Sequence, residues 1–255
     1  MKIATFNANS VRARLPIILD WLASHETDVL ALQETKCEDH VFPLADFEEL
    51  GYHAVIHGQK SYNGVAVLTR GPLESVQKGF GDPTMPEDCR LLVGTYEGIR
   101  IINTYVPNGS KVGSEKWVYK LGWLERFRDF LKAEMARGPV LWLGDINIAP
   151  TSDDVYEAER KLGEVGHHPD EFARLSALVD LGLTDLFRKF TQAPGHYTYW
   201  DFFIKNAPQR GLGWRIDHIY ASADVANRCT ACTIDMEPRL AERPSDHTFV
   251  VAEMD

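Results

Sequence analysis

The chain has 255 residues, of which 44% are hydrophobic and 11% aromatic, and its formal net charge is −10. This content is enough for one domain with a sizeable core over residues 1–255. The lack of an apolar run of roughly 18 residues or of an apolar leader predicts a soluble, cytoplasmic protein with no membrane partner. The acidic balance argues against tight non-specific binding of nucleic acid, although it leaves room for a local basic track and for carboxylates that hold a metal.

Short apolar strands alternate with amphipathic helices along the chain, which predicts a mixed α/β fold. The predicted strands cover residues 3–6, 29–32, 64–70, 91–96, 99–106, 140–143, 214–221 and 249–253. Apolar residues at helical spacing predict helices over residues 15–22, 117–131 and 169–179. Glu97-Gly98 is typical of a two-residue hairpin turn between two of the strands. Since sites in α/β folds gather where strands end, the residues at those points are the candidates for chemistry.

Polar side chains suited to catalysis stand at the ends of these strands. They are Asn7, Glu34, Tyr105, Asp145, Asn147, Asp217, Asp246 and His247. One strand followed by an acid is common by chance, but a recurrence at six or seven ends indicates a shared site. Hydrolysis of an anionic phosphodiester requires groups that neutralise the phosphate, aim or deprotonate a water molecule and assist the leaving oxygen. This set can supply all three.

Glu34 and Asp246 are the candidate ligands of a Mg²⁺ ion, because Mg²⁺ is usually held by one or two carboxylates and keeps several waters. Asn7 and Asn9 offer carbonyl oxygens nearby, directly or through water. For Glu34 alone, the alternative is a solvated carboxylate at a strand end, whereas the segment LQETK as a unit favours the metal site.

Asp145 and Asn147 are two residues apart in the segment LGDINIAP. On extended backbone this spacing places both side chains on one face. Asp145 can then orient or deprotonate the attacking water, and Asn147 can hold the water or the phosphate. The alternative is an Asx turn that closes the strand end.

His247 follows Asp246 directly, ahead of the final strand. A protonated histidine can donate a hydrogen bond to the pentacoordinate phosphorane, and it needs an acidic partner, for which Asp217 in WRIDHIY is best placed. His218 is expected to point to the opposite face of the same strand and to be structural. Tyr105 can donate to the phosphate or to the leaving group, and the alternative is an ordinary strand aromatic.

Substrate contacts are expected from a few cations and from one aromatic cluster. The cations with suitable positions are Arg12, Arg14, Lys36, Arg90, Lys111 and Lys116, and only some of these are expected to touch a nucleic-acid backbone. The aromatic cluster consists of Tyr197, Tyr199, Trp200, Phe202 and Trp214. It is either ordinary core or an apolar pocket that admits an extruded sugar and excludes a stacked base. Spacing alone does not distinguish the two.

Five motifs follow one another in a characteristic order, namely LQETK at 32–36, YVPNG at 105–109, GDINIAP at 144–150, GWRIDHIYAS at 213–222 and PSDH at 244–247. Together they closely resemble the exonuclease III family of abasic-site (AP) endonucleases, within the endonuclease/exonuclease/phosphatase superfamily. The similarity runs from residue 2 to residue 253. It implies a DNase I-like α/β fold, a four-layer αββα sandwich in which two mixed β-sheets are flanked by helices and the site lies at one edge.

The resemblance also implies an activity. Members of this kind are DNA-repair phosphodiesterases that depend on Mg²⁺, for which Mn²⁺ is expected to substitute. They hydrolyse the phosphodiester 5′ to abasic sites in double-stranded DNA, remove 3′ blocking groups and can act as 3′→5′ exonucleases. We expect this chain to act in the same way, as a monomer.

Motif positions imply a role for each candidate residue. The implied metal site is Glu34, with Asn7, Asn9 and Asp246 close to it. The water-activating pair is Asp145 and Asn147, and the phosphate-polarising dyad is Asp217 and His247. The remaining implied substrate contacts are Tyr105 and Asn108 at the phosphate and Tyr199, Trp200, Trp214 and Ile216 around the abasic sugar.

Two features depart from the family pattern. The position of Asn9 is an aspartate in some members, so the negative charge near the metal is lower here. His167 and His168 are expected to be surface or loop residues, in a loop near the substrate groove. A bulky side chain there would bias the enzyme from internal incision toward 3′-end processing.

Other activities within the superfamily are the closest alternatives. They include a phosphomonoesterase for lipid or inositol phosphates, a non-specific DNase and a 3′-end-processing enzyme (3′-phosphatase or exonuclease) with weak abasic incision. The segment LQETK and the pair YTYW and WRID favour the abasic-site branch. A non-enzymatic relative that only binds nucleic acid is disfavoured, because the acidic residues and the histidine of the motifs are all present.

Overall fold

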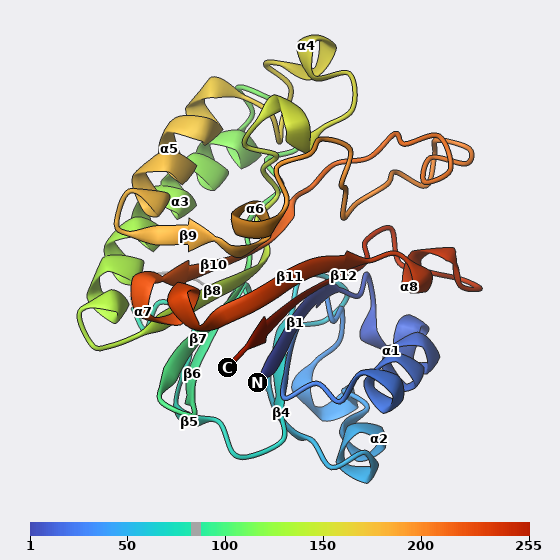
Figure 1. Ribbon diagram of the computed structural model, residues 1–255, viewed down its shortest axis with the longest axis vertical. Coiled ribbons are helices and arrows are strands. Elements are labelled where there is room, and N and C mark those ends of the chain that lie inside the picture. The colour runs from blue at the N-terminus through green and yellow to red at the C-terminus, as the bar shows by residue number, and fades with distance from the viewer. Residues whose placement is uncertain (83–87) are drawn as a thin grey trace.

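Figure 1 shows the computed structural model, which describes residues 1–82 and 88–255. Within these two segments the strands form two six-stranded sheets. The strands of the first sheet, in spatial order, are β11 (Cys229–Asp235), β12 (Phe249–Met254), β1 (Lys2–Asn7), β2 (Val29–Gln33), β4 (Val65–Thr69) and β3 (His53–His57). Those of the second sheet are β5 (Glu74–Lys78), β6 (Leu91–Tyr96), β7 (Ile99–Tyr105), β8 (Val140–Asp145), β10 (Asp217–Ser222) and β9 (Leu183–Asp185). Both sheets are mixed, because β1–β2 and β7–β8 are parallel and the other pairs are antiparallel.

Helices cover the outer face of each sheet (Figure 1). Helices α1 (Val11–His25) and α2 (Leu44–Glu49) pack on the first sheet, where Trp21, Leu22 and Phe47 join its outward-facing residues in one core cluster. Helices α3 (Glu115–Met135) and α5 (Pro169–Val179) pack on the second sheet through residues such as Phe127 and Leu178. The shorter helices are α4 (Ala158–Lys161), α6 (Leu186–Phe190), α7 (Ala223–Arg228) and α8 (Glu237–Leu240), with 3₁₀ turns η1 (Asp39–Val41) and η2 (Ser152–Asp154).

A third cluster fills the space between the two sheets. It contains Ile3 and Val29 from the first sheet and Leu141 and Ile219 from the second, all fully buried. The order of layers is therefore helix, sheet, sheet, helix. The predicted αββα sandwich is confirmed.

The period of two along a strand carries several polar residues into the layer between the sheets. On β1, Ile3 belongs to the inter-sheet core, so Asn7 points to the same side. On β8 and β10 the same alternation puts Asp145 and Asp217 on the side of Leu141 and Ile219. The hydrophobic register thus determines that these side chains meet at one edge of the sandwich.

The structure differs from the sequence prediction at several elements. The strand predicted over residues 214–221 begins only at Asp217, because Trp214 pairs instead in isolated bridges with Val155 and Tyr199. The sequence reading also missed β3, β5, β9 and β11 and all helices other than α1, α3 and α5. Most of these are short, and a few residues carry too little periodicity to indicate their type. In the part of the chain that is described, no helix is long and apolar enough to cross a membrane.

Candidate active site

The ends of the two parallel strand pairs meet where the layer between the sheets opens to solvent. Asn7, Tyr105 and Asp145 are the last residues of β1, β7 and β8, and Glu34 directly follows β2. Nδ2 of Asn7 donates to Oε1 of Glu34 over 2.9 Å and to Oδ2 of Asp145 over 2.8 Å. A single buried amide therefore connects the acidic groups of the two sheets.

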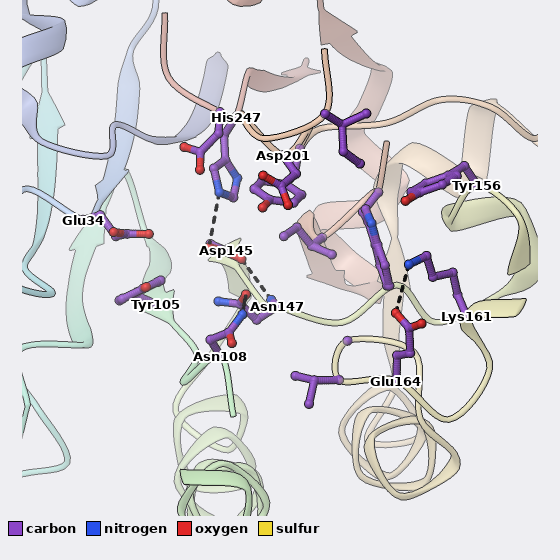
Figure 2. Close-up of a pocket in the computed structure, with 17 residues that line it drawn as sticks. Glu34, Tyr105, Asn108, Asp145, Asn147, Tyr156, Lys161, Glu164, Asp201 and His247 are labelled. Carbon is purple, nitrogen blue, oxygen red and sulfur yellow. Dashed lines mark hydrogen bonds and ion pairs between the residues drawn. The ribbon is translucent and has the colours of Figure 1, made fainter. Parts of the chain in front are cut away.

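The antiparallel strands β10 and β12 bring their first residues to the same edge. Asp217 opens β10, and His247 lies two residues before β12. Nδ1 of His247 is 2.8 Å from Oδ2 of Asp217, and Nε2 is 3.8 Å from Oδ2 of Asp145 (Figure 2). Burial alone would lower the pKa of His247, but Asp217 outweighs it and raises that pKa to about 10. The imidazole is therefore protonated at neutral pH, with Nδ1 donating to Asp217 and Nε2 aimed at the site.

Asp145 lies at the centre of this arrangement and is 1% exposed. Burial raises its pKa to about 8, although the neighbouring His247 lowers it. A carboxyl group with a pKa near neutrality can accept and release a proton under ordinary conditions. Its contacts with Asn7 and His247 place Asp145 where a general base would meet a water molecule in the cavity.

The backbone after Asp145 is not extended, contrary to the prediction. Asn147 has a left-handed backbone with φ of 55°, and its N–H donates to Oδ1 of Asp145 over 2.9 Å. This is the Asx turn that the sequence left as the alternative. The turn still brings both side chains to the site, because Nδ2 of Asn147 donates to the Val106 carbonyl over 3.0 Å and its Oδ1 accepts from Nδ2 of Asn108 over 3.1 Å.

Lys36 joins the acidic side of the site instead of facing a substrate. Its Nζ lies 2.8 Å from Oε2 of Glu34 and donates to Oδ1 of Asn9 over 2.5 Å. Asn9 in turn donates to Oδ1 of Asp246 over 2.9 Å. Lys36 therefore offsets the charge of the group that was predicted to hold a metal, and its contact with a substrate stays a prediction.

The donor set fits a hard divalent cation. Ligand atoms of Glu34, Asp145 and His247 lie within 4.8 Å of one another. His247 is a poor ligand in this group, because it is protonated and its Nδ1 is engaged by Asp217. The remaining groups, Glu34 and Asp145, are carboxylates, and Mg²⁺ prefers oxygen ligands of this kind.

A cavity of about 390 Å³ opens beside these groups (Figure 2). Glu34, Asp145 and His247 line one side of it, and the predicted Tyr199, Trp214 and Ile216 also line it. The sequence reading missed the rest of the wall, which consists of Tyr156, Lys161, Glu164, Val165, Gly166, Asp201 and Ile204. All seven lie outside the five motif segments in the sequence, so the motifs carried no signal for them.

Besides Lys36, two residues predicted to contact substrate do not line the cavity. Trp200 is 2% exposed and packs against Arg239, whose guanidinium lies 5.9 Å from the indole ring. Arg90 lies behind Tyr105, 4.7 Å from its ring centroid, and donates to the Tyr105 carbonyl over 3.2 Å. Neighbouring side chains on extended backbone point to opposite sides. Tyr199 faces the cavity, so Trp200 points away from it.

His167 and His168 lie in the loop before α5, next to residues that border the groove, but His167 is not a surface residue. His167 is 4% exposed, and its Nδ1 lies 2.7 Å from the Ala149 carbonyl. His168 caps α5, since its side chain accepts from the N–H of Asp170. Neither imidazole lines the cavity, which is bordered at this point by the preceding residues 164–166. His218, by contrast, is buried on the opposite face of β10 as predicted, with Nε2 2.9 Å from the Ile148 carbonyl.

Comparison with known proteins agrees with this geometry. Residues 4–247 match the model of the Endonuclease/Exonuclease/phosphatase family. The chain belongs to this family. It is 33% identical to exodeoxyribonuclease III of Haemophilus influenzae, with 99% of each chain covered, and 30% identical to the DNA repair nuclease APEX1 of Danio rerio, with 97% of this chain and 80% of that protein covered. The resemblance drawn from the motifs is confirmed.

Solved structures of the family superpose closely on this chain. An AP endonuclease from Archaeoglobus fulgidus has a TM-score of 0.96 and 42% identity, covering 100% of this chain and 99% of that one. The 3′ phosphatase NExo from Neisseria, bound to a product DNA hairpin, has a TM-score of 0.97 and 38% identity over 100% and 99%. The 3′-5′ exonuclease NExo from Neisseria meningitidis has a TM-score of 0.96 and 39% identity, and both chains are covered completely.

The site of this family member combines three kinds of group within one cavity. Carboxylates that suit a metal lie on one side, a titratable Asp145 lies at the centre, and the protonated His247 lies on the other side. Burial raises the pKa of Tyr105 well above its ordinary value, with a further contribution from Glu34, so its phenol remains a hydrogen-bond donor. Such an arrangement can bind an anionic phosphoester, activate a water molecule and donate to the developing charge.

Proposed function

We propose that the chain is a Mg²⁺-dependent phosphodiesterase of DNA repair, which hydrolyses the phosphodiester 5′ to abasic sites and removes 3′ blocking groups. The observation that carries the proposal is the contact of Asp145 with the pair of His247 and Asp217 beside a cavity that has one apolar wall. The names of the relatives support it, since they include an exodeoxyribonuclease, AP endonucleases and a 3′ phosphatase. The proposed process is base excision repair, which requires both activities.

In the proposed mechanism Glu34 and Asp246 hold the metal, with oxygens of Asn7 and Asn9 close by. A bound Mg²⁺ would supply charge neutralisation at the phosphate, and Mn²⁺ is expected to substitute for it. The two proposed carboxylate ligands are linked by one chain of contacts. Asn9 donates to Asp246 and accepts from Lys36, and Lys36 contacts Glu34.

Asp145 is the proposed general base. It orients the attacking water and takes its proton while the water oxygen forms the new bond to phosphorus and the bond to the leaving 3′ oxygen breaks. Asn147 is held beside it by the Asx turn, and Asn108 is held by Asn147. These two amides are proposed to hold the water and the phosphate.

His247 is the proposed donor to the phosphoryl oxygen as negative charge develops in the phosphorane. Asp217 keeps the imidazole protonated and fixes its orientation through the bond to Nδ1. Tyr105 donates to the phosphate or to the leaving oxygen, for which its protonated phenol is suited.

Tyr199, Trp214 and Ile216 are the proposed wall of a sugar pocket. The Tyr199 ring packs against the His247 imidazole with centroids 4.9 Å apart, so the pocket adjoins the proposed phosphate position. An apolar wall of this kind admits an extruded abasic sugar, which has no base to clash with it. The proposed partner is double-stranded DNA bound by a cytoplasmic monomer.

A 3′-end-processing enzyme with weak abasic incision is the second candidate. It is favoured by the high similarity to NExo, whose structures are described as a 3′ phosphatase and as a 3′-5′ exonuclease. The chemistry at phosphorus is the same in both candidates. They differ in whether the enzyme cleaves a phosphodiester inside a DNA strand or acts at the 3′ end of the strand.

The test is a time course on three matched duplexes that contain an internal abasic site, a 3′-phosphate nick or a recessed 3′ end. Cleavage of the abasic duplex with Mg²⁺, preserved with Mn²⁺ and abolished by chelator, is the expected result. Faster turnover of the 3′-phosphate with little abasic incision would select the second candidate. Activity that persists in chelator, or no activity on any of the three duplexes, would refute the proposed function.

A further inference from the structure

An ion pair with no solvent exposure lies beneath the catalytic loops, outside the cavity. Lys120 on α3 and Glu171 on α5 are both 0% exposed, and Nζ of Lys120 contacts Oε1 of Glu171. The two helices lie side by side on the outer face of the second sheet (Figure 1). Two charges buried at this depth are expensive unless each finds partners for its remaining polar atoms.

The remaining donors of Lys120 go to the backbone of the site. Nζ donates to the carbonyl of Asn147 over 2.8 Å and to the carbonyl of Asn108 over 3.1 Å. An ammonium group has three N–H donors, so these two carbonyls and Glu171 use all of them. The same cation therefore fixes the loop after β7 and the loop after β8.

Glu171 reaches a third loop. Its Oε2 accepts from the N–H of Gly166 over 2.8 Å and from the N–H of His168 over 3.2 Å. Gly166 also lines the cavity, next to Trp214 and to the carbonyl of Asn147. One buried pair therefore joins the two loops that carry the asparagines to a third loop that borders the cavity.

The position of Asn147 depends most on these contacts. Its left-handed backbone is held by its own N–H on Asp145 and, at its carbonyl, by Lys120. Its side chain in turn accepts from Asn108, so a shift of either loop moves both amides. A displacement of about 1 Å in a group that meets the transition state can cost on the order of 100-fold in rate.

We infer that Lys120 and Glu171 are positioning residues, which hold the two asparagines of the site where they meet the reacting phosphate. The inference rests on the function proposed above. Neither residue touches the substrate cavity, and they act through the backbone of the loops. Removing the pair should therefore lower kcat while leaving the ground-state affinity for DNA nearly unchanged.

The test removes both charges together, since deleting one would leave the other buried and unpaired. The variant is Lys120→Met with Glu171→Leu, and Lys120→Gln with Glu171→Gln is a second variant that retains polar side chains in case the first does not fold. The matched control is Arg100→Met with Glu134→Leu. Arg100 and Glu134 form a buried pair of 2.7 Å at the opposite end of β7 from Tyr105.

Steady-state kinetics and thermal unfolding are measured for each variant, on whichever duplex the wild type cleaves. A folded Lys120/Glu171 variant is expected to lose about ten-fold or more in kcat with KM changed less than about two-fold. The control is expected to keep its kcat. When the pair is removed in an Asn108→Ala, Asn147→Ala background, the further loss is expected to be below about two-fold, because both amides through which the pair acts are already absent.

An unchanged kcat in a folded variant, or a full ten-fold loss that persists in the Asn108→Ala, Asn147→Ala background, would overturn the inference. An equal loss of kcat in the Arg100/Glu134 control would also overturn it, because the effect would then be general destabilisation. If the wild type cleaves none of the duplexes, the proposed function fails. If the wild type is active and the pair variants match it, only the inference about Lys120 and Glu171 fails.

Discussion

His247 shows how a single side chain acquires its chemistry from contacts that are distant in sequence. An exposed histidine titrates near neutrality, whereas this one is 4% exposed and bonded to Asp217. Burial alone would lower its pKa, and Asp217 reverses the direction and raises it to about 10. The neighbouring Glu34 has a different character, because it lies at the rim of the layer between the sheets and contacts Lys36.

These two residues should respond differently to substitution. Glu34→Gln removes a carboxylate from the proposed metal site and is expected to raise the Mg²⁺ concentration required for half-maximal activity. His247→Asn removes the protonated donor and is expected to lower kcat by about 100- to 10,000-fold, with no shift in that Mg²⁺ requirement. A Mg²⁺ titration of initial rates for each variant distinguishes the two effects. Full activity in both would contradict both proposed roles.

At the scale of elements, the pocket wall depends on a buried network around Arg215. This residue lies between Trp214 and Ile216, which line the cavity, while its own guanidinium points to the opposite side. It donates to Oδ1 of Asp154 over 2.6 Å and lies 2.9 Å from Oδ2 of Asp185. The network thereby connects η2, β9 and the segment before β10.

The pKa values of these carboxyl groups make the wall sensitive to acid. Burial alone would raise the pKa of Asp185, but Arg215 lowers it well below its ordinary range, and Asp154 is lowered in the same way. A carboxylate with a depressed folded-state pKa stabilises the fold above its unfolded pKa of roughly 4. That stabilisation is lost as the pH falls toward the folded-state value.

The variant Asp185→Asn should therefore unfold at a lower temperature than the wild type at neutral pH. Its melting temperature should also fall less than that of the wild type between about pH 5 and about pH 3, because one linked proton is no longer taken up. Thermal unfolding followed by circular dichroism measures both quantities. Asp129→Asn, which changes an exposed residue on α3, serves as control. Identical pH profiles for Asp185→Asn and the wild type would rule out this account.

At the scale of the whole molecule, the net negative charge of the protein disfavours the binding of an anionic substrate. The net charge is −10, yet the proposed ligand is a polyanion. Few cations border the cavity: Lys161 lines it but is paired with Glu164 at 3.0 Å, and Lys111 lines an adjoining groove. The binding of DNA should therefore depend on a small number of phosphate contacts.

Affinity for an abasic duplex is expected to be modest and to fall with salt. For about three phosphate contacts, the logarithm of the association constant should decrease with the logarithm of salt concentration with a slope of roughly −2.7. Fluorescence anisotropy with the His247→Asn variant measures this slope without turnover. A slope of zero would show that phosphate charge contributes nothing to binding.

Much of the site was visible in the sequence, because local patterns determine it. The period of two in each strand, together with the position where the strand ends, identified Asn7, Asp145 and Asp217. The same features marked Glu34 and His247. Each of these side chains follows from residues that are near in sequence, and the five motifs confirmed the family to which the chain belongs.

Other features were decided only by the tertiary structure. Trp200 and Tyr199 are adjacent aromatics, and only packing against Arg239 determined which of them is buried. Lys36 was predicted to face DNA, but a left-handed backbone and the nearby Asn9 turn its ammonium toward Glu34. His167 was predicted to be a surface or loop residue, and it lies in the loop before α5, where the carbonyl of Ala149 holds its side chain inside.

The sequence by itself determined which polar residues stand at the strand ends of the two sheets, because the period and the end of a strand are local properties of the chain. Only the tertiary structure decided which groups share the cavity and what their pKa values are. The distance from His247 to Asp145 spans two sheets, and the hold of Lys120 on Asn147 spans a helix and a loop. Such contacts depend on how layers pack, and no short segment of sequence encodes the position of a partner in another layer.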